Sequence, residues 1–146
     1  MIMRRGKKGF TIIELLIVIA VIAILVGIAL PRFKGMKDEG NYAKAKGELK
    51  TLKTAVESYY IHSNAYPAAL SNAAAATPSI IAVVPIDAFG TAAYGYGVSP
   101  NGNYYALWSV GPGGTATVTG IANTGAITGS AGDDIYVSNG TVESAG

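Results

Sequence analysis

The hydrophobic pattern of the chain begins with an almost unbroken apolar run from Phe10 to Leu30, in which Glu14 is the single charged residue. Its 21 residues correspond to about 30 Å of α-helix, which matches the thickness of the hydrocarbon core of a bilayer. A lone segment in lipid satisfies its backbone hydrogen bonds only as a helix, so the run predicts a membrane-spanning helix. An ionisable residue inside a span costs free energy, so Glu14 is expected to have a partner.

After Pro31 the pattern changes to an amphipathic helix. Apolar residues recur every three or four positions: Tyr42, Ala45, Leu49, Leu52, Val56 and Tyr59. This spacing places them on one helical face, which we expect to pack on a following sheet. The string at 64–67 should end the helix. Proline lacks an N–H group and each glycine costs a helix about 1 kcal/mol, so a kink or an unwound stretch is also predicted from about Gly27 to Gly40.

Beyond residue 91 the hydrophobic period becomes two, which is typical of strands. Residues 93–98 and 104–110 are rich in aromatic and β-branched side chains, and Ser-Pro-Asn-Gly at 99–102 is a strong hairpin signal. Residues 115–121 and 135–137 predict two more short strands. The expected fold class is therefore α+β, with a long N-terminal helix packed on a small C-terminal antiparallel sheet.

A connecting segment, residues 64–91, separates the predicted helix from the sheet. It is alanine-rich, and we expect a loop with a helical turn at 70–76. Its branched apolar residues should pack against the helix: Ile80, Ile81, Val83 and Val84. The predicted organisation is thus a long helix over 10–63, this connection, and a β-sheet region with a tail over 92–146.

Composition restricts the function. All 11 Lys and Arg residues lie at or before Lys53, so the C-terminal region lacks the cations that nucleic-acid binding needs, and no nucleic-acid partner is expected. The chain has no cysteine, which excludes disulfides, thiolate metal sites and cysteine nucleophiles. With His62 as the single histidine and few acidic residues, no convincing catalytic constellation can be assembled, so we predict that the chain is not an enzyme.

Four basic residues precede the apolar run: Arg4, Arg5, Lys7 and Lys8. By the positive-inside rule they stay in the cytoplasm and the C-terminal region is exported. The junction that follows, G-F-T-I-I-E-L-L-I-V-I-A-V-I-A-I-L from Gly9, resembles the type III (prepilin-type) signal of type IV pilins and type II secretion pseudopilins. The resemblance implies cleavage between Gly9 and Phe10 by a prepilin peptidase, followed by N-methylation of Phe10.

The same resemblance gives Glu14 and Pro31 their roles. It implies that Glu14 pairs with the new amino terminus of a neighbouring subunit during assembly, which suits a carboxylate that is stable in lipid mainly when paired. Pro31 falls where these proteins often carry a helix-bending proline. The expected divisions are then a leader over 1–9, a transmembrane and later filament-core segment over 10–30, and an amphipathic half over 31–63.

Three C-terminal strings resemble the major pseudopilin of type II secretion: P-I-D-A-F-G at 85–90, W-S-V-G-P-G-G at 108–114 and G-D-D-I at 132–135. In that family the last two segments form a calcium-binding loop, so the resemblance makes Asp133 and Asp134 candidate calcium ligands. Gly113 stands where the family usually has its first aspartate. Because calcium takes about 6–8 oxygen ligands, the alternative is a solvated pair of aspartates without metal.

We therefore predict a structural subunit of a type IV pilus-like filament, best matched by the major pseudopilin of a type II secretion system. It is expected to be a single-pass inner-membrane precursor with an exported C-terminus, and then part of a periplasmic or cell-surface filament. The expected partners are other copies of the chain, prepilin peptidase, the inner-membrane assembly platform, and minor pilins or pseudopilins.

Three alternatives remain open. The first is a surface type IV pilin for adhesion, motility or DNA uptake, and the second is a membrane-anchored exported binding module that does not polymerise. The third is an ordinary signal peptide cut after Ala29, which is disfavoured because its apolar region usually has about 7–15 residues and this one is longer. Replacing Glu14 by Ala distinguishes a polymer from a simple anchor. A polymer should lose assembly, whereas an anchor should insert into the membrane equally well or better.

Overall fold

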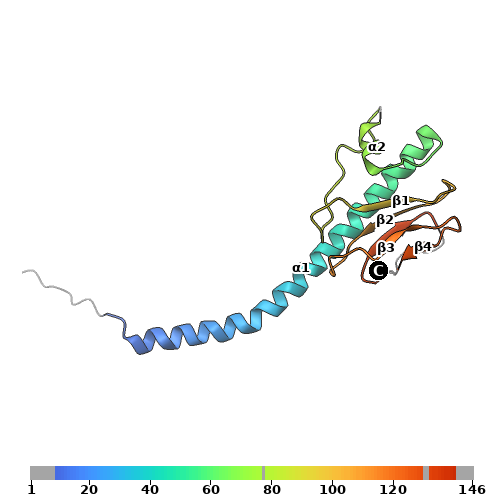
Figure 1. Ribbon diagram of the computed structural model, residues 1–146. Coiled ribbons are helices and arrows are strands. Elements are labelled where there is room, and N and C mark those ends of the chain that lie inside the picture. Colours follow the sequence, from blue (N-terminus) through green and yellow to red (C-terminus); the bar gives the residue numbers. More distant parts are fainter. Residues whose placement is uncertain (1–8, 77, 130–131, 141–146) are drawn as a thin grey trace, which may run out of the picture. The chain divides into compact units, whose positions relative to one another are not determined.

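The computed structural model describes residues 9–76, 78–129 and 132–140 (Figure 1). The predicted basic leader, apart from Gly9, lies outside the described residues. The chain divides into two compact units, Met1–Lys37 and Asp38–Gly146. Helix α1 (Ile12–Ser63) contributes residues to both units.

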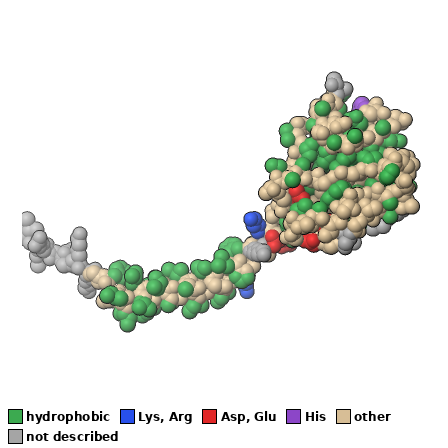
Figure 2. Space-filling model, viewed as in Figure 1, with side chains coloured by type: hydrophobic (Ala, Val, Ile, Leu, Met, Phe, Trp, Pro, Cys, Tyr) green, Lys and Arg blue, Asp and Glu red, His purple; other side chains and the backbone are tan. Residues whose placement is uncertain are grey.

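In the first unit, α1 carries exposed apolar side chains on all its faces. The consecutive residues Leu15, Leu16 and Ile17, which point in different directions around the helix, are each more than half exposed, and Figure 2 shows apolar side chains along this segment. Among the described residues, α1 is the one helix long and apolar enough to cross a membrane. A helix that is apolar all round requires lipid or other helices around it.

The backbone of α1 stays helical through Pro31, so of the two predicted outcomes for Gly27 to Gly40 the unwound stretch is wrong for this single chain, while the kink stays a prediction. Proline removes one backbone hydrogen bond and crowds the carbonyl four residues earlier, at a cost of about 3 kcal/mol. Helix propagation is cooperative, so the well-formed turns on both sides of Pro31 carry the helix across an isolated breaker.

The second unit buries the predicted stripe of α1. Four stripe residues are at most 2% exposed: Ala45, Leu49, Leu52 and Val56. They form one core with Tyr105, Leu107 and Ile135 from the sheet, while Tyr42 is partly buried against it. The helical period read from the sequence is therefore confirmed as the face that contacts the sheet.

Two small antiparallel sheets make up the β region (Figure 1). The first has the order β1-β2-β5, with bounds Gly95–Val98, Tyr105–Ser109 and Ile135–Ser138. The second is a hairpin of β3 (Val118–Ile121) and β4 (Ile127–Gly129). The four predicted strands are confirmed, three with shorter bounds and β5 one residue longer, and the α+β fold class is confirmed.

The end of α1 and the turn between β1 and β2 lie where the sequence predicts them, whereas strand β4 was not predicted. Asn64 ends α1 in the left-handed region with φ 52°, and its N–H donates to Tyr60 O at 2.7 Å. The hairpin turn closes through Gly102 N–H to Ser99 O at 2.8 Å. Strand β4 is three residues long and ends in Gly129 at φ 93°, too short to show a period of two.

The connection contains α2 (Leu70–Ala75), which confirms the predicted helical turn. Ile81 and Val84 pack against the core as expected, but Val83 is 77% exposed, so its predicted contact is wrong. This stretch is irregular, and without a helical or strand period hydrophobicity alone does not say which side chains face inward.

Candidate functional site

The amino-terminal end of α1 is a capping box formed by Thr11 and Glu14. Glu14 Oε2 accepts hydrogen bonds from Thr11 N–H at 2.9 Å and Thr11 Oγ1 at 2.8 Å. In return, Thr11 Oγ1 accepts a bond from Glu14 N–H at 3.3 Å. These bonds satisfy donors that the first helical turn leaves free, and they place a negative charge at the positive end of the helix.

The capping box lies directly after the predicted processing junction. Gly9 and Phe10 are exposed and precede the helix, and Phe10 is 86% exposed. The carboxylate of Glu14 thus bonds to the residue that follows Phe10. The structure brings Gly9, Phe10 and Glu14 to one helix end, while Pro31 lies far along the same helix. The Thr-x-x-Glu spacing that signals a capping box was readable in the sequence, and the sequence analysis missed it.

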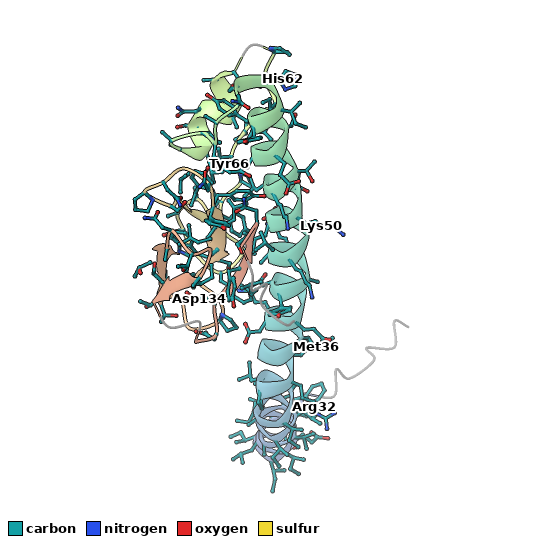
Figure 3. The ribbon with its side chains drawn as sticks, turned by 90° about the vertical axis from the view of Figure 1, so that its right-hand side faces the viewer. Arg32, Met36, Lys50, His62, Tyr66 and Asp134 are labelled. Carbon is teal, nitrogen blue, oxygen red and sulfur yellow. The ribbon has the colours of Figure 1, made fainter. Side chains whose placement is uncertain are left out.

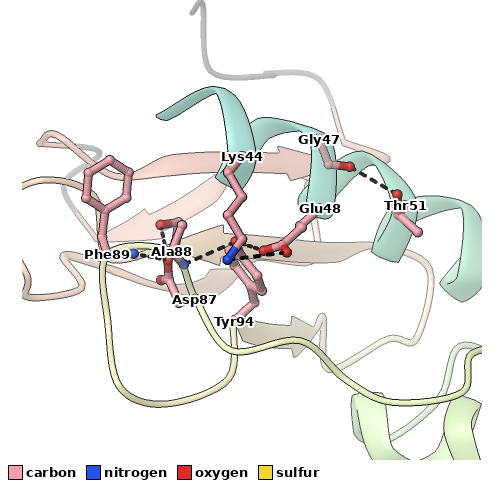
Figure 4. Close-up of polar contacts among 9 residues, drawn as sticks. Lys44, Gly47, Glu48, Thr51, Asp87, Ala88, Phe89 and Tyr94 are labelled. Carbon is pink, nitrogen blue, oxygen red and sulfur yellow. Dashed lines mark hydrogen bonds and ion pairs between the residues drawn. The ribbon is translucent and has the colours of Figure 1, made fainter. Parts of the chain in front are cut away.

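Polar bonds join the second half of α1 to the sheet (Figure 4). Tyr94 Oη donates to Glu48 Oε2 at 2.5 Å, and Lys44 Nζ lies 3.9 Å from Glu48 Oε1. Tyr105 Oη donates to Glu57 Oε1 at 2.9 Å. Each tyrosine therefore contributes its ring to the apolar core and its hydroxyl to a carboxylate on the helix.

These hydroxyls titrate at higher pH than free tyrosine. Burial raises the pKa of Tyr105 well above its ordinary value, and the hydrogen bond to Glu57 adds to the increase. Burial and the bond to Glu48 likewise raise the pKa of Tyr94. Both shifts favour the neutral phenol, so at neutral pH the tyrosines remain hydrogen-bond donors to the carboxylates.

Asp87, in the 85–90 string, ties the connecting segment to the end of β2. Its side chain is nearly buried, and Oδ1 accepts bonds from Phe89 N–H at 3.0 Å and Ser109 Oγ at 2.7 Å. Oδ2 accepts a bond from Val110 N–H at 2.8 Å. All three donors surround one carboxylate, so Asp87 is a structural centre of the unit, a role that sequence reasoning did not assign.

Asp133 and Asp134 lie just before β5, and their carboxylates bind backbone amides between residues 113 and 118. Asp134 Oδ2 accepts bonds from Thr117 N–H and Val118 N–H, both at 2.7 Å, and the carboxylate of Asp133 accepts a bond from Gly113 N–H. Figure 3 shows Asp134 in the sheet region. Among the described residues, no three His, Cys, Asp or Glu side chains form a group that could hold a metal ion.

A helical segment that is apolar except for Glu14 and begins in a capping box, followed by a small sheet docked on the second half of the helix, defines a pilin-like structural subunit. Two family models match the chain: the prokaryotic N-terminal methylation motif over residues 4–30 and type II secretion system (T2SS), protein G, over residues 32–124. The second match covers more than half of the chain, so the chain belongs to the type II secretion system protein G family.

Similar proteins are secretion pseudopilins and pilins. The type II secretion system core protein G of Pseudomonas aeruginosa is 33% identical over 64 residues, which are 44% of this chain and 45% of that protein. The type IV major pilin protein PilA of Myxococcus xanthus is 42% identical over 60 residues, covering 41% and 27% of the two chains. The type IV major alpha-pilin of Moraxella bovis is 48% identical over 52 residues, covering 36% and 33%.

These matches define the molecular class. The chain spans less than half the length of the curated relatives that it matches. No solved structure matches it. Its family consists of structural pilin and pseudopilin subunits, so the chain is a structural protein and not an enzyme. The apolar N-terminal helix and the family together indicate a subunit anchored in the inner membrane before it enters a filament.

Proposed function

We propose that the chain is the major pseudopilin of a type II secretion system, which forms a helical homopolymer after cleavage between Gly9 and Phe10. The observation that carries this proposal is the protein G match over residues 32–124, which extends well beyond the apolar run. The apolar run matches the general N-terminal methylation motif, and the relatives include pilins and pseudopilins alike, so this run does not separate the two.

The exposed side chains of the first unit support a filament core. Residues such as Leu15 and Leu25 are about 60% exposed, and they lack a partner within this unit of the single chain as far as it is described. Membrane helices associate through packing and hydrogen bonds because lipid tails are as apolar as leucine. Moving this helix from lipid into a bundle of identical helices therefore replaces one apolar surrounding by another at little cost.

Glu14 is proposed to recruit the incoming subunit. Both bonds that it accepts from Thr11 end on Oε2. A carboxylate has about four lone-pair sites, so Oε1 can accept a further bond from the methylated amine of Phe10 of a neighbouring subunit. Pairing the two charges offsets the cost of holding either one alone in an apolar surrounding. The proposed assembly partners are prepilin peptidase, the inner-membrane platform and minor pseudopilins.

The test is a shear-fraction assay in the native host, with wild type and Glu14→Ala. For the pseudopilin we expect a processed chain that stays in the envelope and cross-links to itself, and a variant that is processed but does not cross-link. Glu39→Gln, an exposed acidic residue of α1, is the matched control and should behave like wild type.

The competing function is a surface type IV pilin, which the pilin relatives of 42% and 48% identity favour. Long sheared filaments at normal expression would establish this function in place of the pseudopilin. An unprocessed membrane monomer that Glu14→Ala does not alter would instead indicate an anchored module that never polymerises.

A further inference from the structure

The loop over residues 111–117, which leads into β3, is fastened by two adjacent aspartates, Asp133 and Asp134. Asp134 is 6% exposed, and its Oδ2 accepts two backbone bonds of 2.7 Å from Thr117 and Val118 at the start of β3. Asp133 accepts a bond from Gly113 N–H near the opposite end of the loop. Two carboxylates therefore accept hydrogen bonds from three backbone amides, and these bonds join both ends of the loop to the residues just before β5.

The space beside Gly113 is filled by Asp133. A Cβ atom at Gly113 would lie 2.6 Å from Asp133 Oδ2, which is closer than real Cβ atoms approach. Gly111 has φ 61°, and a Cβ there would lie 2.1 Å from Asp133 O. A side chain at position 113, including the aspartate that the resemblance leads one to expect, would require the exposed Asp133 carboxylate to move away from the Gly113 N–H. The direct hydrogen bond from Gly113 N–H to Asp133 therefore depends on glycine at position 113.

A calcium ion does not fit this arrangement. Calcium takes about 6–8 oxygen ligands, whereas three lone pairs of these carboxylates already face N–H donors, whose positive ends repel a cation. Among the described residues, no metal-binding group of three acidic, His or Cys side chains forms. Two buried oxygens, Thr117 Oγ1 and Asp134 Oδ1, accept no bond. Two oxygens are far fewer than the roughly 6–8 ligands that calcium takes.

We propose that Asp133 and Asp134 order residues 111–118 by binding backbone amides directly, so that the second unit folds without a divalent cation. Charge-assisted bonds from a carboxylate to backbone N–H groups are among the stronger hydrogen bonds in proteins. In this chain they take the place that a metal holds in a calcium-binding loop. This inference concerns the fold of one subunit and does not depend on whether the filament is a pseudopilus or a pilus.

The test uses the full chain in detergent micelles and compares buffer containing EDTA with buffer containing millimolar calcium chloride. We expect the same thermal unfolding midpoint in both buffers and no saturable heat when calcium is titrated into the chelated protein. In EDTA, the amides of Thr117 and Val118 should be protected from hydrogen exchange. A higher midpoint in calcium, saturable calcium binding, or unprotected amides in EDTA would each overturn the proposal.

Two variants test the bonds from Asp133 and Asp134 to the backbone amides. Asp134→Ala should lower the unfolding midpoint by the same amount in both buffers and expose the Thr117 and Val118 amides to exchange. Gly113→Ala should displace the Asp133 carboxylate and so lower the midpoint, and adding Asp133→Ala should lower it little further, because both changes break the same bond. Gly47→Ala, where a Cβ meets nothing within 4 Å, is the control for adding a methyl group, and because it lies inside α1 it should raise the midpoint rather than lower it. An Asp134→Ala effect confined to calcium buffer would contradict direct amide binding.

Discussion

The buried carboxylate of Asp87 offers a demanding test of how the second unit is held together. Replacing Asp87 by Ala removes the acceptor for three donors: Phe89 N–H, Ser109 Oγ and Val110 N–H. Ser109 is fully buried, so solvent reaches its hydroxyl poorly after the change. Asp87→Asn is milder, because the side-chain amide keeps one acceptor oxygen. Its NH2 group replaces the other oxygen and faces one of the donors, which then loses its acceptor.

The expected loss follows from these bonds. A hydrogen bond to a charged group contributes about 1.5–3 kcal/mol, and leaving a buried donor unsatisfied costs about 1–3 kcal/mol. The two backbone donors are partly buried, and water satisfies them in part, so we expect a total loss of about 3–5 kcal/mol for Asp87→Ala. A unit of this size has a free energy of unfolding of roughly 5–15 kcal/mol, so the loss is a large fraction of it. Asp87→Asn should cost about 1–3 kcal/mol.

The assay is urea unfolding of the full chain in micelles, followed by the fluorescence of Trp108. It is the single tryptophan of the chain, and it lies on β2 beside Ser109, so its signal reports on this unit. Glu39→Gln is the control for the loss of an acidic residue at an exposed position. A loss below about 1 kcal/mol for Asp87→Ala would refute the argument, because it would mean that the three donors find other partners at little cost.

Three further predictions concern α1 and its contacts. Leu49→Ala removes a side chain that is 0% exposed, and it should lower the free energy of unfolding by about 2–5 kcal/mol in the same urea assay. Burial raises the folded-state pKa of Tyr105 above the ordinary value near 10. The free energy of unfolding that this hydroxyl contributes is therefore fully present below pH 10 and falls as the pH rises above it. Tyr105→Phe should make this fall shallower in urea titrations on either side of pH 10. Thr11→Ala should cost the helix start about 1 kcal/mol and speed amide exchange in the first turn, whereas Thr51→Ala, whose hydroxyl donates to a mid-helix carbonyl, should not.

Much of the fold was predictable because its signals are local. The stripe from Tyr42 to Val56, the end of α1 near Asn64 and the hairpin turn at 99–102 all follow from residue spacing or turn chemistry within a few positions. Continuity of the helix through Pro31 depends on the cooperativity of the flanking turns, which a count of breaking residues does not include.

The candidate sites were predictable only in part. The junction at Gly9 and Phe10 and the charge at Glu14 are sequence features, and the structure adds the capping box. The bonds from Tyr94 to Glu48 and from Tyr105 to Glu57 join residues 46 and 48 positions apart, so no local pattern announces them. A buried carboxylate such as Asp87 likewise reveals its three donors only when the chain has folded around it.

Folding of the second unit and assembly through the first should be separable, because the core is complete without the apolar run. The earliest residue of α1 in the core or packed against it is Tyr42, while the apolar side chains from Ile12 to Leu30 stay largely exposed. Glu14→Ala should therefore leave the urea midpoint of Trp108 fluorescence unchanged while abolishing self-cross-linking in the host. A shifted midpoint would show that the two units share stability, and the assembly defect could then no longer be assigned to the lost charge.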